Sequence, residues 1–127
     1  MANKLSIVII TKNEEKFISD AVNSSIFADE VLVLDSESTD KTCNIAKEIG
    51  ARVEQQAWLG FGAQKNKAVE LADNDWVFVL DADERITPEL RDEIIFTLKN
   101  PQFDGYRIAR LNNFFGKYIK TCGLYPD

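Results

Sequence analysis

The chain has 127 residues, and its 45% hydrophobic and 28% charged residues favour one folded domain over residues 1–127 and exclude the composition of disordered chains. The net charge of −6, from 15 basic and 21 acidic residues, denies it the basic surface that phosphate-backbone binding requires, so we expect no nucleic-acid partner. The chain has no histidine, which leaves carboxylates, lysine, tyrosine, cysteine and backbone groups for any chemistry.

Short runs rich in β-branched residues alternate with stretches whose apolar residues recur at helical spacing. Gly50 stands where a glycine is expected after a helix, and Pro88 in a first helical turn. In chain order we predict a strand at 5–10, a helix at 14–24, a strand at 31–34, a helix from a cap at Ser38, Thr39 or Asp40 to about Ile49, an edge strand at 51–54, a helix at 63–72, a strand at 76–80, a helix from Thr87 to about Lys99, and short strands at 106–109 and 114–119.

This alternation predicts an α/β fold, a mainly parallel sheet with helices on both faces. In open sheets of this class, ligands bind outside the carboxyl ends of the strands. Polar segments at 11–14, 35–40 and 81–84 directly follow the three most apolar strands. They are far apart in the sequence, and we expect the sheet to bring them together at one edge.

The two cysteines, Cys43 and Cys122, form no close motif, which is typical of a reducing compartment rather than of a disulfide framework or a zinc site. The apolar run at 5–10 is followed at once by charged residues, unlike a signal peptide. No apolar run approaches the ~20 residues that span a bilayer. We therefore expect a cytoplasmic protein.

Asp81-Ala82-Asp83 follows the strand at 76–80 directly. Two nearby carboxylates repel each other unless a cation compensates them. Mg²⁺ or Mn²⁺ takes oxygen ligands, often one or two from the protein and the rest from diphosphate and water. The pair therefore suits a metal–diphosphate site, although so short a pattern is also found in solvated turns.

Asp35 and Lys65 are weaker candidates. A carboxylate at a strand end, such as Asp35, either binds a ribose or base or serves as a loop acid or helix cap. Lys65 lies on the helix that follows a glycine-containing loop, where its ammonium either reaches a diphosphate or faces solvent. Gly60 and Gly62 either let the backbone approach a ligand or make a turn.

Four segments, in this order and strand context, resemble glycosyltransferase family 2, the inverting enzymes of the GT-A fold: Val8–Glu14, Val33–Asp40, Gly60–Ala68 and Val79–Glu84. The third, with Gly105–Arg107 and Gly123–Asp127, is similar to the bacterial lipopolysaccharide-core β-glucosyltransferases. The resemblance implies a GT-A-like (Rossmann-like) sheet, of which this chain would be the nucleotide-sugar-binding half.

The resemblance also implies a role for each matching residue. Thr11, Asn13 and Glu14 would line the uridine pocket, Asp35 would bind the base or ribose, Lys65 would approach the diphosphate with Asn66 supporting its loop, Asp81 would face the ribose or metal, and Asp83 would coordinate Mg²⁺ or Mn²⁺. The donor would be a UDP-sugar, foremost UDP-glucose. The acceptor would be a lipopolysaccharide-core or other glycan, including a lipid-linked one, which implies work in the cytoplasm or peripheral at the inner membrane.

One departure from the family concerns the catalytic base, which in the family lies well downstream of the position of Asp83. Asp104 and Asp127 are the only acids after Glu93, and neither matches the base motif. We therefore expect a C-terminally truncated chain without its base, inactive or poorly active in transfer. An open sheet edge in such a chain favours self-association.

Two alternatives to a glycosyltransferase stay open. One is a nucleotide-binding module without catalysis. The other is a magnesium-dependent phosphotransferase with Asp81 as nucleophile, since haloacid-dehalogenase-like enzymes also place D-x-D after an apolar strand. Those enzymes want threonine or valine where this chain has Arg85, which disfavours the second alternative.

Overall fold

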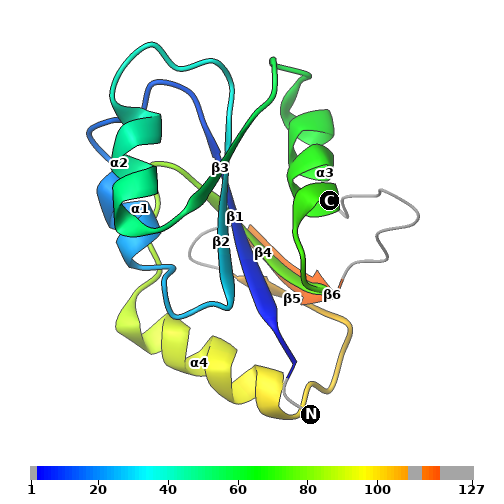
Figure 1. Ribbon diagram of the computed structural model, residues 1–127. Coiled ribbons are helices and arrows are strands. Elements are labelled where there is room, and N and C mark those ends of the chain that lie inside the picture. The colour runs from blue at the N-terminus through cyan, green and yellow to red at the C-terminus, as the bar shows by residue number, and fades with distance from the viewer. Residues whose placement is uncertain (1–2, 109–112, 118–127) are drawn as a thin grey trace.

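The computed structural model of the chain describes residues 3–108 and 113–117. Strands and helices alternate along them, as the sequence predicts (Figure 1). The elements are β1 (Leu5–Thr11), α1 (Ile18–Asn23), β2 (Glu30–Asp35), α2 (Thr42–Ile49), β3 (Arg52–Gln55), α3 (Phe61–Leu71), β4 (Trp76–Asp81), α4 (Pro88–Lys99), β5 (Gly105–Ile108) and β6 (Asn113–Lys117).

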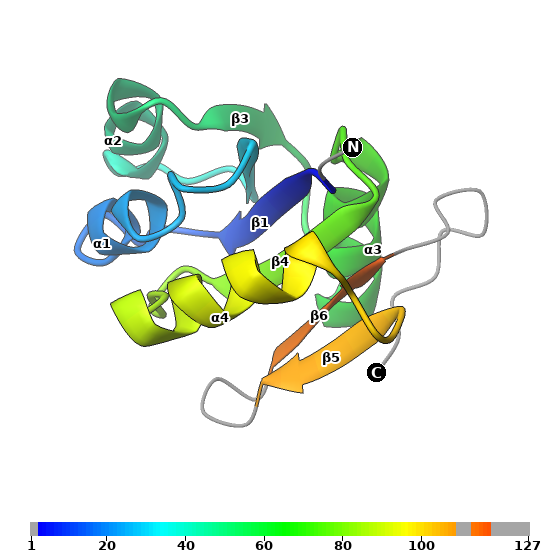
Figure 2. The ribbon, with the colours of Figure 1, turned by 90° about the horizontal axis from the view of Figure 1, so that it is seen from below.

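The strands form one six-stranded sheet in the order β3-β2-β1-β4-β6-β5. Strands β1 to β4 pair in parallel, and β6 and β5 extend the sheet antiparallel beside β4 (Figure 2). The predicted mainly parallel sheet is therefore confirmed. The carboxyl ends of β1 and β2 lie level, with Thr11 opposite Asp35, and β4 ends beside them, with Asp81 opposite Ile10.

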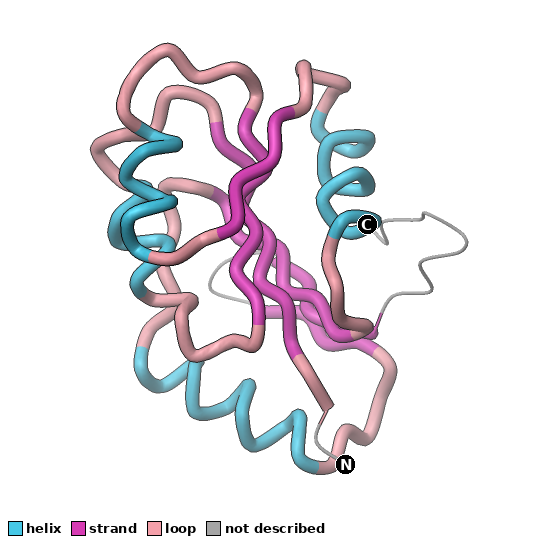
Figure 3. The backbone as a smooth tube through the Cα atoms, in the orientation of Figure 1, coloured by secondary structure: helices cyan, strands magenta, loops and turns pink. Residues whose placement is uncertain are grey.

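Each face of the sheet carries its own apolar core, because helices cover both faces (Figure 3). On one face α1, α2 and α4 pack against inward residues such as Ile7, Ile9 and Phe78. On the other face α3 packs against Val8, Val77 and their neighbours. Burial on both faces explains why the central strands read as unbroken apolar runs rather than alternating ones.

Three helix starts differ from the predictions, and one of them is that of α3, which begins at Phe61 rather than at residue 63. Helix α1 begins at Ile18 rather than near residue 14, because Glu14 first closes a turn, its carbonyl accepting the N–H groups of Phe17 and Ile18. Helix α2 begins at Thr42, and Asp40 accepts the Thr42 N–H at 3.0 Å, so the predicted capping acid lies two residues before the helix.

Other helix ends match their predictions. Gly50 ends α2 with a φ of 116°, a left-handed conformation that favours glycine. Thr87 caps α4 by accepting the N–H of Leu90 at 3.2 Å, with Pro88 as the first helical residue. Residues 109 and 118–119 of the predicted short strands lie outside the described residues, as do Cys122 and Gly123–Asp127.

The edge strand β3 carries Arg52 and Glu54, which pair at 3.1 Å, and Arg52 also reaches Glu30 at 2.9 Å. Charged residues on an edge discourage pairing with another sheet. Self-association through an apolar edge stays a prediction. In the part of the chain that the structure describes, every helix is too short or too polar to cross a membrane.

Asp35 forms a buried polar anchor between the ends of β1 and β2, with no part of its side chain exposed. Its oxygens accept hydrogen bonds from Thr11 Oγ1 at 2.7 Å, Ser38 Oγ at 2.6 Å, Ser38 N at 2.8 Å and Gln55 Nε2 at 3.1 Å. Burial opposes ionisation, but the hydrogen bonds from Ser38 and Thr11 outweigh it, so the pKa of Asp35 lies below its ordinary value. We call these residues the Asp35 cluster.

Replacing the buried carboxylate should destabilise the fold. In Asp35→Asn the side-chain NH₂ group would face the hydroxyl and N–H donors that now bond to the carboxylate. We therefore expect the free energy of unfolding to fall by about 2–4 kcal/mol at pH 7. Urea denaturation followed by circular dichroism measures this change. Asp75→Asn, at an exposed aspartate before β4, is the matched control and should change stability by less than about 0.5 kcal/mol. Equal stability of the two variants would contradict the anchoring role.

The same carboxylate should shape acid unfolding. The pKa of Asp35 is lower in the folded chain than in the unfolded one, so the ionised carboxylate stabilises the fold. This contribution to the free energy of unfolding is fully present above the unfolded pKa of about 3.9 and is lost as the pH falls through the folded pKa. The stability difference between wild type and Asp35→Asn should therefore shrink below about pH 4. Denaturation series at pH 7, 5, 4 and 3 test this, and a difference that stays constant would exclude it.

Candidate functional site

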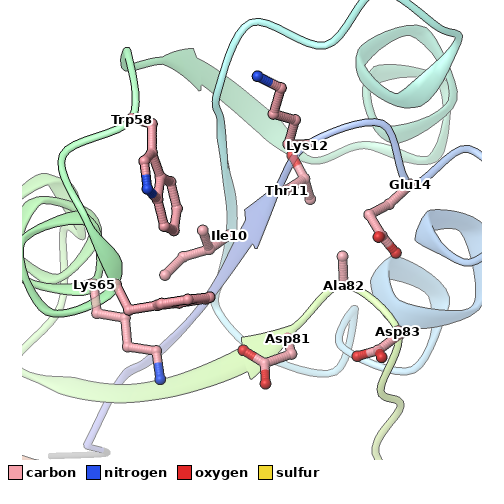
Figure 4. Close-up of a pocket in the computed structure, with 10 residues that line it drawn as sticks. Ile10, Thr11, Lys12, Glu14, Trp58, Lys65, Asp81, Ala82 and Asp83 are labelled. Atoms are coloured by element: carbon pink, nitrogen blue, oxygen red, sulfur yellow. The ribbon is translucent and has the colours of Figure 1, made fainter.

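A pocket of about 490 Å³ opens at the carboxyl ends of β1 and β4, in the size range of small-molecule sites (Figure 4). It is lined by Ile10, Thr11, Lys12, Glu14, Trp58, Phe61, Lys65, Asp81, Ala82 and Asp83. These residues come from the ends of β1 and β4, the loops that follow these two strands, the loop after β3 and the first turns of α3. The sheet thus brings distant segments together as the sequence predicts.

Not every predicted site residue lines this pocket. Thr11, Glu14, Lys65, Asp81 and Asp83 do. Asn13 and Asp35 lie behind it, Asn13 in the loop after β1 and Asp35 at the end of β2, and each is described below.

The turn at 81–84, the acidic turn, presents two carboxylates because the residue between them is buried. Ala82 is only 4% exposed and belongs to the core on the α4 face, whereas Asp81 and Asp83 are exposed. Glu84 closes the turn: its Oε1 accepts the Asp81 N–H at 3.0 Å, and its own N–H donates to the Asp81 carbonyl at 3.0 Å. Both aspartates therefore face the pocket rather than the core.

Glu14 adds a third carboxylate to the pocket. Its backbone N–H donates to Thr42 Oγ1 at 2.8 Å, which fixes the loop after β1 against α2. Its Oε2 is buried without a hydrogen-bond partner. Burial, and then the charges of Asp83 and Asp40, raise the pKa of Glu14 above its ordinary value. This side of the pocket therefore concentrates negative charge that a bound cation would offset.

The carboxylates fit a cation that is shared with a ligand better than a closed metal cage. Among residues 3–108 and 113–117, no three aspartate, glutamate, cysteine or histidine side chains gather closely enough to hold a metal ion by themselves. Mg²⁺ and Mn²⁺ accept one or two protein carboxylates and complete their shell with phosphate and water oxygens. Asp81 and Asp83, exposed at one end of the pocket, match that donor set.

The opposite side of the pocket is aromatic. Trp58 and Phe61 meet edge to face, with ring centroids 4.9 Å apart, and we call this pair the aromatic wall. Figure 4 shows Trp58 beside Ile10, across the pocket from Asp83, with the ammonium of Lys65 on the side where Asp81 lies. Both charge signs and an apolar surface thus meet in one pocket.

Gln64 holds the loop that carries Trp58, the kind of support that the family resemblance implies for Asn66. Gln64 is fully buried; its Oε1 accepts the Leu59 N–H at 3.1 Å, and its Nε2 donates to the Gln56 carbonyl at 3.3 Å. Gly60 turns the chain into α3 with a φ of 99° and a ψ of 158°, a conformation essentially restricted to glycine. A side chain at Gly62 would meet nothing within 4 Å, so protein packing does not demand that glycine.

Asn13 and Asp35 act behind the pocket. Asn13 has a φ of 51°; its Oδ1 accepts the Thr39 N–H at 2.8 Å, and its own N–H donates to Ser38 Oγ at 2.7 Å. Asp35 is engaged by the hydrogen bonds of its cluster, so the geometry favours support over direct contact with a ligand. Together they lock the loops after β1 and β2 to each other.

Several residues that line or support the pocket could not be predicted from the sequence. The sequence motifs assign no role to five residues that matter in the structure: Lys12, Trp58 and Phe61 line the pocket, and Gln64 and Glu84 support it. The one usable signal was the occurrence of two aromatic residues within a glycine-containing loop, because large apolar side chains in such loops are commonly exposed for binding.

The chain is similar to several known glycosyltransferases. The family model described as Glycosyl transferase family 2 matches residues 6–120. A protein of Rickettsia bellii, named an uncharacterized glycosyltransferase, is 47% identical over 137 residues, covering 98% of this chain and 47% of that protein. The lipopolysaccharide core biosynthesis glycosyltransferase LpsC of Rhizobium meliloti is 34% identical over 129 residues, covering 97% of this chain and 46% of LpsC. The chain therefore spans less than half the length of these relatives.

Solved structures of GT-A enzymes share the fold, which confirms the expected fold class. S. aureus TarS 1-349 in complex with UDP-GlcNAc superposes with a TM-score of 0.69 at 28% identity, over 80% of this chain and 33% of that one. Glucosyl-3-phosphoglycerate synthase of Mycobacterium tuberculosis superposes with a TM-score of 0.75 at 21% identity, over 91% of this chain and 57% of that one. The family model covers residues 6–120, and the Rickettsia bellii relative is 47% identical over 98% of this chain. The chain therefore belongs to glycosyl transferase family 2.

Proposed function

We propose that the chain is the donor-binding part of a glycosyltransferase and that its pocket binds a UDP-sugar together with Mg²⁺ or Mn²⁺. The observation that carries the proposal is the convergence of Asp81, Asp83 and Lys65 on one pocket whose far side is apolar. The likeness to TarS, whose solved complex contains UDP-GlcNAc, supports a uridine nucleotide as the ligand. UDP-glucose is the donor that the sequence motifs favour.

The proposal gives a role to each of the seven site residues that the sequence predicts. Asp83 and Asp81 hold the cation, with Glu14 beside Asp83, Lys65 places a positive charge against the diphosphate, and Thr11 lines the pocket toward the nucleoside. Asn13 and Asp35 keep the loops in place through the hydrogen bonds described above. When bound, the cation stabilises the negative charge that develops on the leaving diphosphate.

Inverting transfer also needs a group that takes the proton from the acceptor hydroxyl. We assign this base to none of the pocket carboxylates. Asp81 and Asp83 are committed to the cation in the proposal, and a carboxylate that binds a cation is a weak base. Glu14 lies beside Asp83, so the proposed cation offsets its charge as well.

The likeness to LpsC supports a lipopolysaccharide-core glycan as acceptor, with other glycans, including lipid-linked ones, as the broader class. We propose that the enzyme acts in the cytoplasm, peripherally at the inner membrane, where a lipid-linked acceptor would be located. Membership of the family removes the ground for a phosphotransferase with Asp81 as nucleophile. A nucleotide-binding module without transfer remains the second candidate, and UDP-glucose binding without turnover would favour it.

The cation role of Asp83 can be tested by binding. Isothermal titration calorimetry should show that Mn²⁺ strengthens UDP binding to the wild type, and that Asp83→Asn weakens binding in Mn²⁺ by at least about tenfold, since even residues behind a metal ligand matter by that factor. Asp92→Asn, on the exposed side of α4, is the matched control. Equal UDP affinity of wild type and Asp83→Asn in Mn²⁺ would refute the assigned role.

The diphosphate role of Lys65 can be separated from nucleoside recognition. In Lys65→Met the aliphatic stem remains and the charge is lost, so UDP binding should weaken by about tenfold at low salt, the scale of one charged hydrogen bond. Uridine, which carries no phosphate, should bind wild type and variant alike. The difference in UDP affinity should narrow in high salt, because salt screens charge interactions. A parallel loss for uridine would show that the substitution disturbs the pocket itself.

A further inference from the structure

We propose that the aromatic wall, Trp58 with Phe61, stacks on the base of the donor nucleotide and gives the pocket its preference for a nucleoside diphosphate over bare phosphates. This inference rests on the proposed function and deepens it. The motifs that point to donor binding leave both rings without a role. Both line the same pocket as Asp81 and Asp83.

The two rings expose much of their surface inside the pocket. Trp58 is 47% exposed and Phe61 is 74% exposed, whereas the other tryptophan, Trp76, is 4% exposed in the core. Leaving large aromatic surface in water forgoes about 25 cal/mol per Å² of possible burial, which a ligand that covers the rings would recover. An aromatic surface inside a pocket is therefore a candidate contact for a flat ligand group.

The wall is fixed in place before any ligand binds. The rings support each other edge to face at 4.9 Å. Gln64, fully buried, holds the loop on both sides of Trp58 through Gln56 and Leu59. Preset geometry lowers the ordering cost of binding, which suits a stacking surface better than a loop that must fold around its ligand.

The two sides of the pocket match the two ends of a nucleoside diphosphate. Trp58 and Ile10 lie on one side, and Asp83 and Asp81 on the other (Figure 4). If the diphosphate and its cation lie at the carboxylates, the nucleoside and the donor sugar leave the diphosphate from opposite ends, and of the two only the nucleoside carries a flat aromatic group that can stack on a ring. The base, at the other end of the molecule, is the part that reaches the aromatic wall.

Two probes separate base stacking from phosphate binding: UDP and inorganic pyrophosphate, each with Mn²⁺, measured by calorimetry. Base–aromatic stacking is lost on alanine substitution at a cost that corresponds to about 5- to 150-fold in affinity. For a small pyrimidine we expect Trp58→Ala to weaken UDP binding by about 5- to 20-fold and to change pyrophosphate binding by less than about twofold. Trp58→Phe, which keeps a ring, should restore most of the UDP affinity.

Phe96→Ala is the matched control, since Phe96 is 77% exposed on α4 and lies outside the pocket. It should leave both affinities unchanged. Tryptophan fluorescence gives a second measurement: UDP should quench the wild-type emission more than pyrophosphate does, and the extra quenching should vanish in Trp58→Phe. Because Trp58 is about half exposed, its replacement leaves the cores of the fold intact.

The outcomes distinguish this inference from the proposed function. If the wild type binds UDP and Trp58→Ala binds it equally well, the stacking role is overturned and the proposed function stands. Equal losses for UDP and pyrophosphate also overturn stacking. If Trp58→Ala retains UDP binding but loses binding to anionic phospholipid vesicles, the wall is a membrane contact instead. A wild type that binds neither UDP nor pyrophosphate with Mn²⁺ overturns both proposals.

Discussion

A single buried carboxylate organises the functional edge of this sheet. Asp35 accepts hydrogen bonds from β1, from the loop after β2 and from β3, so three neighbouring segments share one acceptor. Burying a charge is costly unless its lone pairs are filled, and here the surrounding donors fill them. These hydrogen bonds hold Thr11 at the end of β1 and fix the start of the loop after β2. The loop after β1, which carries Glu14, is held in turn by the hydrogen bond between Asn13 and Ser38.

The electrostatics of the pocket follow from where the remaining acids lie. Glu14 and Asp83 face the same space, and one oxygen of Glu14 is buried without a partner. Lys65 supplies positive charge from α3, which packs on the face of the sheet opposite to α1, α2 and α4. An acidic protein can receive a polyanionic nucleotide only where such charges are balanced locally, and the proposed cation completes that balance.

The strands and the acidic turn could be predicted because their signals are local: unbroken apolar runs, a cap at Thr87 and a D-x-D pattern after β4. The supporting role of Asp35 could not be, since its partners Thr11 and Gln55 lie 24 and 20 residues away and only strand pairing reveals them. Gln64 and the aromatic wall could not be predicted for another reason, since their contacts are local: Gln64 bonds to residues five and eight positions away. Periodicity predicts that a residue lies on a helix or in a loop, but it does not predict which loop atoms that residue will hold.

The burial of Ala82 makes the middle position of the acidic turn a limit on side-chain size. Its methyl group packs into the core formed with α1 and α4, while the acids on both sides remain in water. A bulkier residue would have to lift the turn out of the core, and both carboxylates would move with it. Steric pressure from the interior can therefore select what stands between two charged neighbours, even though that residue contributes no polar group of its own.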